Sequence, residues 1–217
     1  MELPLFPLRT VLFPGMPLPL RIFEERYKVM VRELLANDGE FGVLLIREGQ
    51  EVGGGAKPHE FGTLARIEEA TELQGGRFAI EARGTSRFRL RRMLPPRPYP
   101  YGEIEIIGEP QPTPTPQLQH ALETVRTTFP LYFRLALSLS DQWAEPLKLP
   151  VGAHELVDFI APWLQVEEEA KQRLLELEMA RDRVAHLAEV LDDLLLRTRE
   201  EVDEHRRTKY RGIGAGN

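Results

Sequence analysis

Two segments of the sequence contain residues with the types and spacing of known catalytic or binding motifs. "HELVD" (154–158) resembles the zinc-binding pattern H-E-x-x-H, but Asp158 stands where the second imidazole ligand belongs. Acidic residues in the first turn of a helix also have a structural role, because they interact favourably with the helix dipole. The glycine-rich "GQEVGGGAK" (49–57) lacks the Gly-Lys-Ser/Thr ending of a phosphate loop, and a predicted strand follows it instead of a helix. We expect neither segment to bind metal or phosphate.

Nucleophilic catalysis has no better support. The sequence has no cysteine, and its three serines, Ser86, Ser138 and Ser140, lie outside any G-x-S-x-G motif. We therefore predict a protein that binds rather than catalyses, with no catalytic residue, metal ion or cofactor.

Arginines in "RGTSRFRLRRML" (83–94) form the strongest candidate for a charged binding surface. Arg87, Arg89 and Arg91 alternate along a predicted strand and would share one of its faces, a possible contact for nucleic acid. The simpler interpretation is a solvated strand face whose arginines pair with glutamates of neighbouring strands. The net charge of −6 supports this interpretation, because phosphate binding requires a basic surface.

Composition indicates an ordinary globular protein of one large or two small domains. Hydrophobic residues make up 42% of its 217 residues and charged residues 29%. The apolar start "LPLFPLRTVLFPGMPLPL" (3–20) has no basic leader and contains five prolines, so we expect neither a secretory signal nor a membrane helix. The expected compartment is the cytoplasm.

The opening segment is predicted to form two short strands around a turn. Pro14-Gly15 has the residue order of a type II turn, and Leu18, Leu20 and Ile22 alternate as the buried face of a strand. We interpret the segment as a strand pair that leads into a helix over 23–35, which Asp38-Gly39 ends.

Alternating patterns dominate the rest of residues 1–110. They predict strands in "FGVLLI" (41–46), "FGTLARIEEA" (61–70), "RFAIEARG" (77–84), "SRFRLRRML" (86–94) and "YGEIEII" (101–107), with a loop over 47–60. We predict a mostly antiparallel β module with one helix, which closes into a barrel.

Helical spacing replaces strand spacing after a proline-rich linker at 111–117. In 118–217 we expect an α-helical part, with a helix from 118, a second within 130–140 and another over "GAHELVDFIAPWL" (152–164). The last and longest helix is predicted over about 167–207, and it offers a surface for homo-oligomerisation. The fold class is thus α+β, with a β module followed by a helical bundle.

Three stretches give a family resemblance over residues 3–197. "LPLFPLRTVLFPGMPLPLRIFEERY", "FGTLARIEEATELQGGRFAIEARGTSRFRL" and "LVDFIAPWLQVEEEAKQRLLELEMARDRVAHLAEVL" resemble the N-terminal substrate-binding domain of the Lon ATP-dependent proteases. The resemblance implies a PUA-like β module followed by a helical bundle. The sequence contains no Walker A loop or Ser-Lys protease domain, so it resembles the stand-alone members of the family.

The resemblance implies a function in binding unfolded or flexible protein segments, as an adaptor in protein quality control whose partner is a protease or chaperone. The alternative is a nucleic-acid-binding PUA-like module. Exposed apolar groups near proline-rich strands are candidates for the peptide site, and we assign it to Phe13, Met16, Pro17, Tyr99 and Tyr101.

Overall fold

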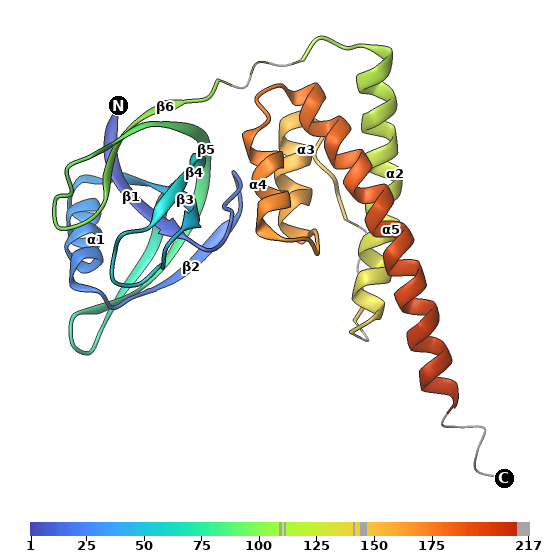
Figure 1. The fold of residues 1–217 in the computed structure, drawn as a ribbon, viewed down its shortest axis with the longest axis horizontal. Helices are drawn as coiled ribbons and strands as arrows, with labels where there is room; N and C mark the ends of the chain where they lie inside the picture. The colour runs from blue at the N-terminus through green and yellow to red at the C-terminus, as the bar shows by residue number, and fades with distance from the viewer. Residues whose placement is uncertain (109, 111, 141, 144–146, 212–217) are drawn as a thin grey trace. The chain divides into compact units, whose positions relative to one another are not determined.

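The computed structural model of the protein divides into two compact units. It describes residues 1–108, 110, 112–140, 142–143 and 147–211. Unit 1 comprises Met1–Pro110 and Val166–Glu178, and unit 2 comprises Gln111–Gln165 and Met179–Asn217 (Figure 1). The sequence analysis assigns all of 118–217 to one helical part, whereas the structure places Val166–Glu178 with the β-rich unit.

Unit 1 is built around six strands: β1 (Glu2–Leu8), β2 (Pro17–Ile22), β3 (Glu40–Glu48), β4 (Lys57–Leu73), β5 (Arg77–Leu94) and β6 (Tyr101–Ile106). Their order is β2-β5-β4-β3-β1-β6, and β5 also pairs with β6. The pairings therefore connect five strands, from β5 through β4, β3, β1 and β6, in a closed ring. All of these pairings are antiparallel except the parallel one between β1 and β3.

The prediction that the first two strands pair with each other is wrong. β1 pairs with β3 and β6, while β2 pairs with β5. The connection over 9–16 is too long for a tight hairpin, and it places the apolar Val11, Leu12 and Phe13 in the interior. The predicted turn is confirmed: Gly15 has φ +78°, and Met16 N–H donates to the Phe13 carbonyl at 3.1 Å.

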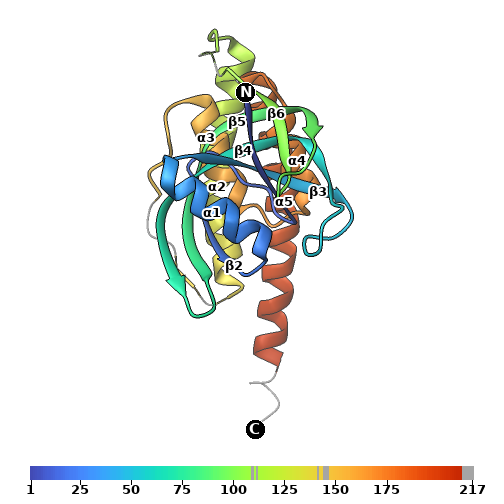
Figure 2. The same ribbon diagram turned by 90° about the vertical axis from the view of Figure 1, so that its left-hand side faces the viewer.

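Helix α1 (Glu25–Asn37) lies alongside the strands of unit 1 in both views (Figures 1 and 2). It ends at Asp38, which adopts the left-handed conformation with φ +48°, and Gly39 N–H donates to the Leu34 carbonyl. Its buried residues Tyr27, Met30 and Val31 join side chains of β1 and β2 in the main hydrophobic core.

A second, smaller core is formed by side chains of β1, β3, β4, β5 and β6. It comprises Leu3, Leu5, Leu44, Leu64, Phe88, Leu90 and Ile104. Glycine is required where this core is tightest, because a Cβ on Gly62 would lie 2.2 Å from the Val43 carbonyl oxygen.

Helix α4 (Glu168–Glu176) packs against β4 as part of unit 1. Glu168 accepts a hydrogen bond from Val11 N–H at 2.6 Å, and Gln172 donates to the Phe61 carbonyl at 3.0 Å. The predicted single helix over 167–207 is therefore wrong: α4 ends at Glu176, and a new helix begins at Ala180.

Unit 2 contains α2 (Pro116–Ser138), α3 (Ala153–Ile160), the short 3₁₀ helix η1 (Ala161–Trp163) and α5 (Ala180–Arg211). Helix α2 begins inside the predicted linker, where the Thr115 side chain caps it by accepting from Leu118 N–H. It also continues through Pro130, so the predicted separate helix within 130–140 is wrong. The buried Phe129 and Tyr132 on either side of Pro130 keep this segment packed and offset the lost backbone hydrogen bond.

No helix among the described residues has the length and apolar character needed to cross a membrane.

Candidate functional site

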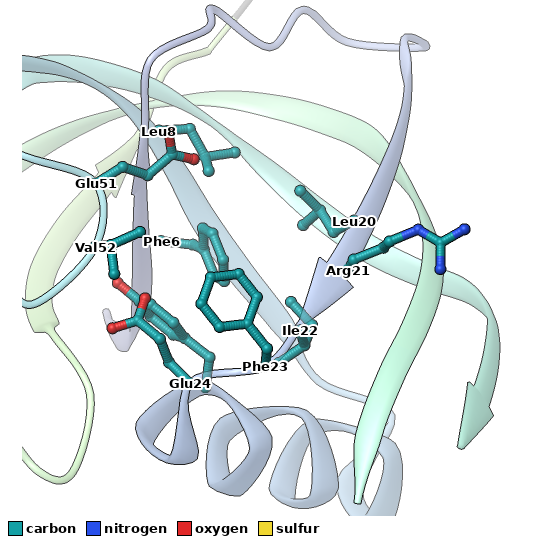
Figure 3. Close-up of a pocket in the computed structure, with 10 residues that line it drawn as sticks. Phe6, Leu8, Leu20, Arg21, Ile22, Phe23, Glu24, Glu51 and Val52 are labelled. Atoms are coloured by element: carbon teal, nitrogen blue, oxygen red, sulfur yellow. The ribbon is translucent and has the colours of Figure 1, made fainter. Parts of the chain in front are cut away.

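An apolar pocket of about 270 Å³ opens in unit 1 between β1 and β2. Phe6 and Leu8 of β1 line one side, and Leu20 and Ile22 of β2 line the other (Figure 3). At the mouth, the Phe23 and Val52 side chains are 56% and 54% exposed. Large apolar side chains that remain this exposed around a hollow are typical of a binding surface.

The position of Phe23 follows from the local sequence. Strand β2 ends at Ile22 and α1 begins at Glu25, so Phe23 lies in the short connection between them. The alternation of β2 directs Ile22 into the core, and the next side chain therefore points out of it. Figure 3 shows the Phe23 ring between the β1 and β2 side chains of the pocket.

Polar contacts hold the loop over 49–56 at the opposite side of the mouth. The Glu24 carboxylate forms an ion pair with Arg26 at 3.0 Å and accepts a hydrogen bond from Gly53 N–H at 3.3 Å. Arg26 also donates to the Glu51 carbonyl at 3.4 Å. These contacts position Glu51 and Val52 beside the pocket and connect the loop to the start of α1.

The Tyr27 side chain at the pocket is buried against an aromatic neighbour. The Phe6 and Tyr27 rings lie 4.1 Å apart, and burial raises the pKa of Tyr27 to about 12. The Tyr27 phenol is therefore neutral near pH 7 and is poorly suited to act as a general base. Within the described residues, no group of three or more His, Cys, Asp or Glu side chains is placed to hold a metal ion.

The structure separates the five residues that the sequence analysis assigns to the peptide site. Phe13 is fully buried, with its carbonyl group against Gly84, whereas Met16 is half-buried against the core and Pro17 is exposed. None of these three lines the pocket.

Tyr99 and Tyr101 line a different depression, together with residues of α1 and the chain start. Their rings lie 6.4 Å apart, and the Tyr99 hydroxyl donates to Glu33. Tyr99 is only 3% exposed. Phe13 and Tyr99 are therefore interior residues, and the expectation that their side chains are available to a partner is wrong.

The three β5 arginines that the sequence analysis considers as a nucleic-acid contact have different environments. Arg87 is buried and donates to the carbonyls of Leu175 and Leu177, at 2.8 and 2.7 Å, and of Glu178, at 3.3 Å. The expectation that Arg87 belongs to a solvated face is thus wrong, because α4 covers that part of β5.

Arg89 and Arg91 match the expected cross-strand pairing. Arg89 donates to Glu60 at 3.2 Å and lies over the Phe61 ring, and Arg91 pairs with Glu105. Glutamates pair with both side chains, so the alternative of a basic surface for nucleic acid is not favoured.

The "HELVD" segment forms a buried polar cluster in unit 2. Arg183 donates to Asp158 at 2.5 Å, and its guanidinium nitrogen lies 3.3 Å from His154 Nδ1. Because a guanidinium only donates hydrogen bonds, His154 Nδ1 is the acceptor. His154 and Asp158 thus contact an arginine in the interior of unit 2.

Sequence reasoning missed the pocket residues Phe6, Phe23 and Val52. Phe23 begins a helical apolar stripe in the sequence, and Val52 lies among glycines in a segment predicted as a surface loop. The available signal was the apolar residue directly after an alternating strand, since the strand period places Ile22 and Phe23 on opposite sides.

Comparison with known proteins identifies the family. Residues 2–193 match the family described as the ATP-dependent protease La (LON) substrate-binding domain. The chain belongs to this family, whose model describes a substrate-binding domain and not the protease domain.

Lon proteases are among the relatives. The chain is 26% identical over 223 residues to the Lon protease of Syntrophus aciditrophicus, and the match covers 96% of the chain and 28% of that protein. It is 24% identical over 192 residues to Lon protease 2 of Myxococcus xanthus, with 88% of the chain and 23% of that protein covered. The chain thus spans about a quarter of the length of these relatives.

Solved structures of Lon N-terminal domains share the fold. A Lon N-terminal domain protein from Xanthomonas campestris is 28% identical, with a TM-score of 0.65, and the match covers 86% of this chain and 96% of that one. The N-terminal domain of a Mycobacterium avium complex Lon protease has a TM-score of 0.63 at 17% identity, over 89% of this chain and 99% of that one. These matches support a mixed fold with a β-rich N-terminal part followed by helices.

Proposed function

We propose that unit 1 binds apolar segments of unfolded or flexible proteins in the pocket between β1 and β2. The observation that carries this proposal is the exposure of Phe23 and Val52 around an apolar hollow. Burial of a leucine or phenylalanine side chain in such a hollow contributes about 1.5–3 kcal/mol. A free energy of this size gives a modest affinity, as expected for a module that captures many different segments.

The family supports the same function. Membership in the Lon substrate-binding domain family supports a role in substrate binding, associated with proteolysis. Within this role, we propose that the protein delivers bound segments to a protease or chaperone, as an adaptor with a PUA-like β module. Nucleic-acid binding is the weaker alternative, because Arg89 and Arg91 are paired with glutamates and Arg87 is buried.

The experiment that tests the proposal compares variants of exposed apolar residues. Phe23→Asp and Val52→Asp place a carboxylate at the pocket mouth, and Met93→Asp is a matched control, because Met93 in the same unit is 46% exposed but lies outside the pocket. Binding of a reduced, carboxymethylated model protein is measured by fluorescence anisotropy. Circular dichroism checks that each variant is folded.

We expect Phe23→Asp and Val52→Asp to weaken binding about tenfold, since each removes apolar contact and buries a charge on binding. Met93→Asp should bind as the parent protein does. Equal affinities for all three variants and the parent would exclude this pocket as the binding site.

A further inference from the structure

We propose that a bound segment pairs as an extended strand with the free edge of β2, and that its preferred sequence has a basic residue two positions from the apolar anchor, on the same face of the strand. The inference rests on the proposed function and specifies how the pocket recognises its ligand. The ligand is thus an extended segment of another polypeptide chain, recognised through its backbone and its charge as well as its apolar side chains.

Strand β2 has one paired and one unpaired edge. It lies at the end of the strand order and pairs only with β5. Among the described residues, no backbone hydrogen bond reaches the other edge of β2. That edge borders the pocket, because Leu20, Arg21 and Ile22 line it, with Phe6 and Leu8 of β1 on the far side (Figure 3).

The register of β2 determines which groups the free edge presents. Met16 is opposite Gly84, and its carbonyl accepts from Gly84 N–H at 3.0 Å. In an antiparallel pair, the backbone N–H and C=O groups of every second residue point to the same adjacent strand. Leu18, Leu20 and Ile22 therefore also direct their backbone groups to β5. Pro17, Pro19 and Arg21 therefore direct their carbonyls to the free edge.

Because of two prolines, this edge mainly accepts hydrogen bonds. Pro17 and Pro19 have no N–H, so the edge offers three carbonyls and the single N–H of Arg21. A second copy of the same edge would bring carbonyls against carbonyls along most of its length. A general polypeptide segment, in contrast, supplies an N–H at every second residue and can pair with this edge.

The charge at the pocket mouth is complementary to a cation. Arg26 neutralises Glu24. The Glu51 carboxylate has no recorded ion pair or hydrogen bond within the described part of the chain, although it lines the pocket. In Figure 3 the Arg21 side chain points away from the pocket. A lysine or arginine two positions from the apolar anchor would point to the same face of the strand and could pair with the Glu51 carboxylate.

Backbone N-methylation of a peptide probe tests the strand pairing. The probe is a short, labelled synthetic peptide of alternating valine and threonine, with a central leucine and a lysine two residues after it. Two versions are N-methylated on alternate residues, one on the odd set and one on the even set. Only one set of N–H groups can face β2, so we expect one version to lose about tenfold in affinity and the other to bind nearly as the parent peptide does.

Changes in charge test the second element of the proposal. Replacing the peptide lysine by glutamate should weaken binding about threefold, and Glu51→Gln should remove this difference. Glu72→Gln is the matched control, because Glu72 is exposed near the β4–β5 turn and lies outside the pocket.

The outcomes distinguish this inference from the proposed function. If both N-methylated peptides bind as the parent does, strand pairing is excluded while apolar capture stands. Equal losses from both sets also contradict pairing at this single edge. A lysine preference that survives Glu51→Gln contradicts the role of Glu51. If neither the parent peptide nor the carboxymethylated protein binds, both proposals are wrong.

Discussion

Arg87 on β5 donates a hydrogen bond of 2.8 Å to the backbone carbonyl of Leu175 at the end of α4, 88 residues later in the chain. The same guanidinium also binds the carbonyls of Leu177 and Glu178. The last carbonyls of a helix have no intrahelical donor, so one buried cation satisfies groups that would otherwise need water. Arg87 thereby ends α4 and attaches it to the β-rich unit.

Replacement of Arg87 should destabilise unit 1 selectively. Arg87→Met leaves several buried carbonyls without donors, and we expect a loss of about 2–4 kcal/mol. Hydrogen exchange of β4 and β5 peptides, followed by mass spectrometry, measures this loss. Both tryptophans, Trp143 and Trp163, lie in unit 2, so their fluorescence reports separately on that unit.

Arg91→Gln is the control for Arg87, because Arg91 is exposed and pairs with Glu105 at the surface. Its effect should stay within about 0.5 kcal/mol. If the two variants have equal exchange rates in β4 and β5, Arg87 is not the attachment of α4.

Gly15 in the first turn and Gly84 of β5 beside that turn should respond differently to substitution. Gly15 has φ +78° and open space around it, so Gly15→Ala should cost about 1 kcal/mol through backbone strain alone, and Gly15→Val somewhat more. A Cβ on Gly84 would lie 2.3 Å from the Phe13 carbonyl oxygen, so Gly84→Ala should cost more than Gly15→Ala.

Urea unfolding, monitored by far-ultraviolet circular dichroism, ranks these variants by their free energy of unfolding. A Gly84→Ala protein as stable as Gly15→Ala would show that the turn and β5 are not packed as closely as described.

Stability should fall at alkaline pH because two tyrosines are protected from ionisation. Burial raises the pKa of Tyr27 to about 12, and burial together with Glu33 raises that of Tyr99 to about 12. The ordinary value of 10.0 applies in the unfolded chain, so the folded state binds more protons between about pH 10 and 12. The stabilisation is complete below pH 10 and is lost as the pH rises towards 12.

Chemical denaturation at a series of pH values tests this effect. Tyr27→Phe should reduce the slope of stability against pH in this range. An unchanged slope for Tyr27→Phe would place the Tyr27 phenol in contact with water.

RNA binding should be absent near physiological salt. Arg89 and Arg91 pair with glutamates and Arg87 is buried, so no cluster of available cations remains on β5. A filter-binding assay measures the affinity of the protein for single-stranded RNA. Salt-sensitive binding that disappears in the Arg89→Gln, Arg91→Gln double variant would restore the nucleic-acid alternative.

Local features of the fold could be predicted from the sequence, because they depend on neighbouring residues. The Pro14-Gly15 turn, the inward face of Leu18 and Ile22 and the end of α1 near Asp38 follow from turn chemistry and hydrophobic period. Long-range contacts could not be predicted in this way. The pairing of β1 with β3, and the break between α4 and α5, depend on contacts between residues far apart in the sequence.

The candidate site was harder to predict than the fold. The sequence analysis places the peptide site near the proline-rich strands, and β2 forms one wall of the pocket that we propose as the site. The choice of Phe13 failed because its apolar side chain fits the interior, and hydrophobicity alone does not distinguish a core residue from an exposed one. Phe23 could be recognised only once the ends of β2 and α1 were known.

Site-specific photo-crosslinking tests the central claim most directly. A photoreactive phenylalanine analogue is placed at position 23, at 52 or, as a control, at 93, and each protein is irradiated with the carboxymethylated model protein. The account predicts crosslinked products from positions 23 and 52 and little product from position 93. An excess of model protein without a label should compete with the products from positions 23 and 52. Equal crosslinking from all three positions, or crosslinking from position 93 alone, would contradict it.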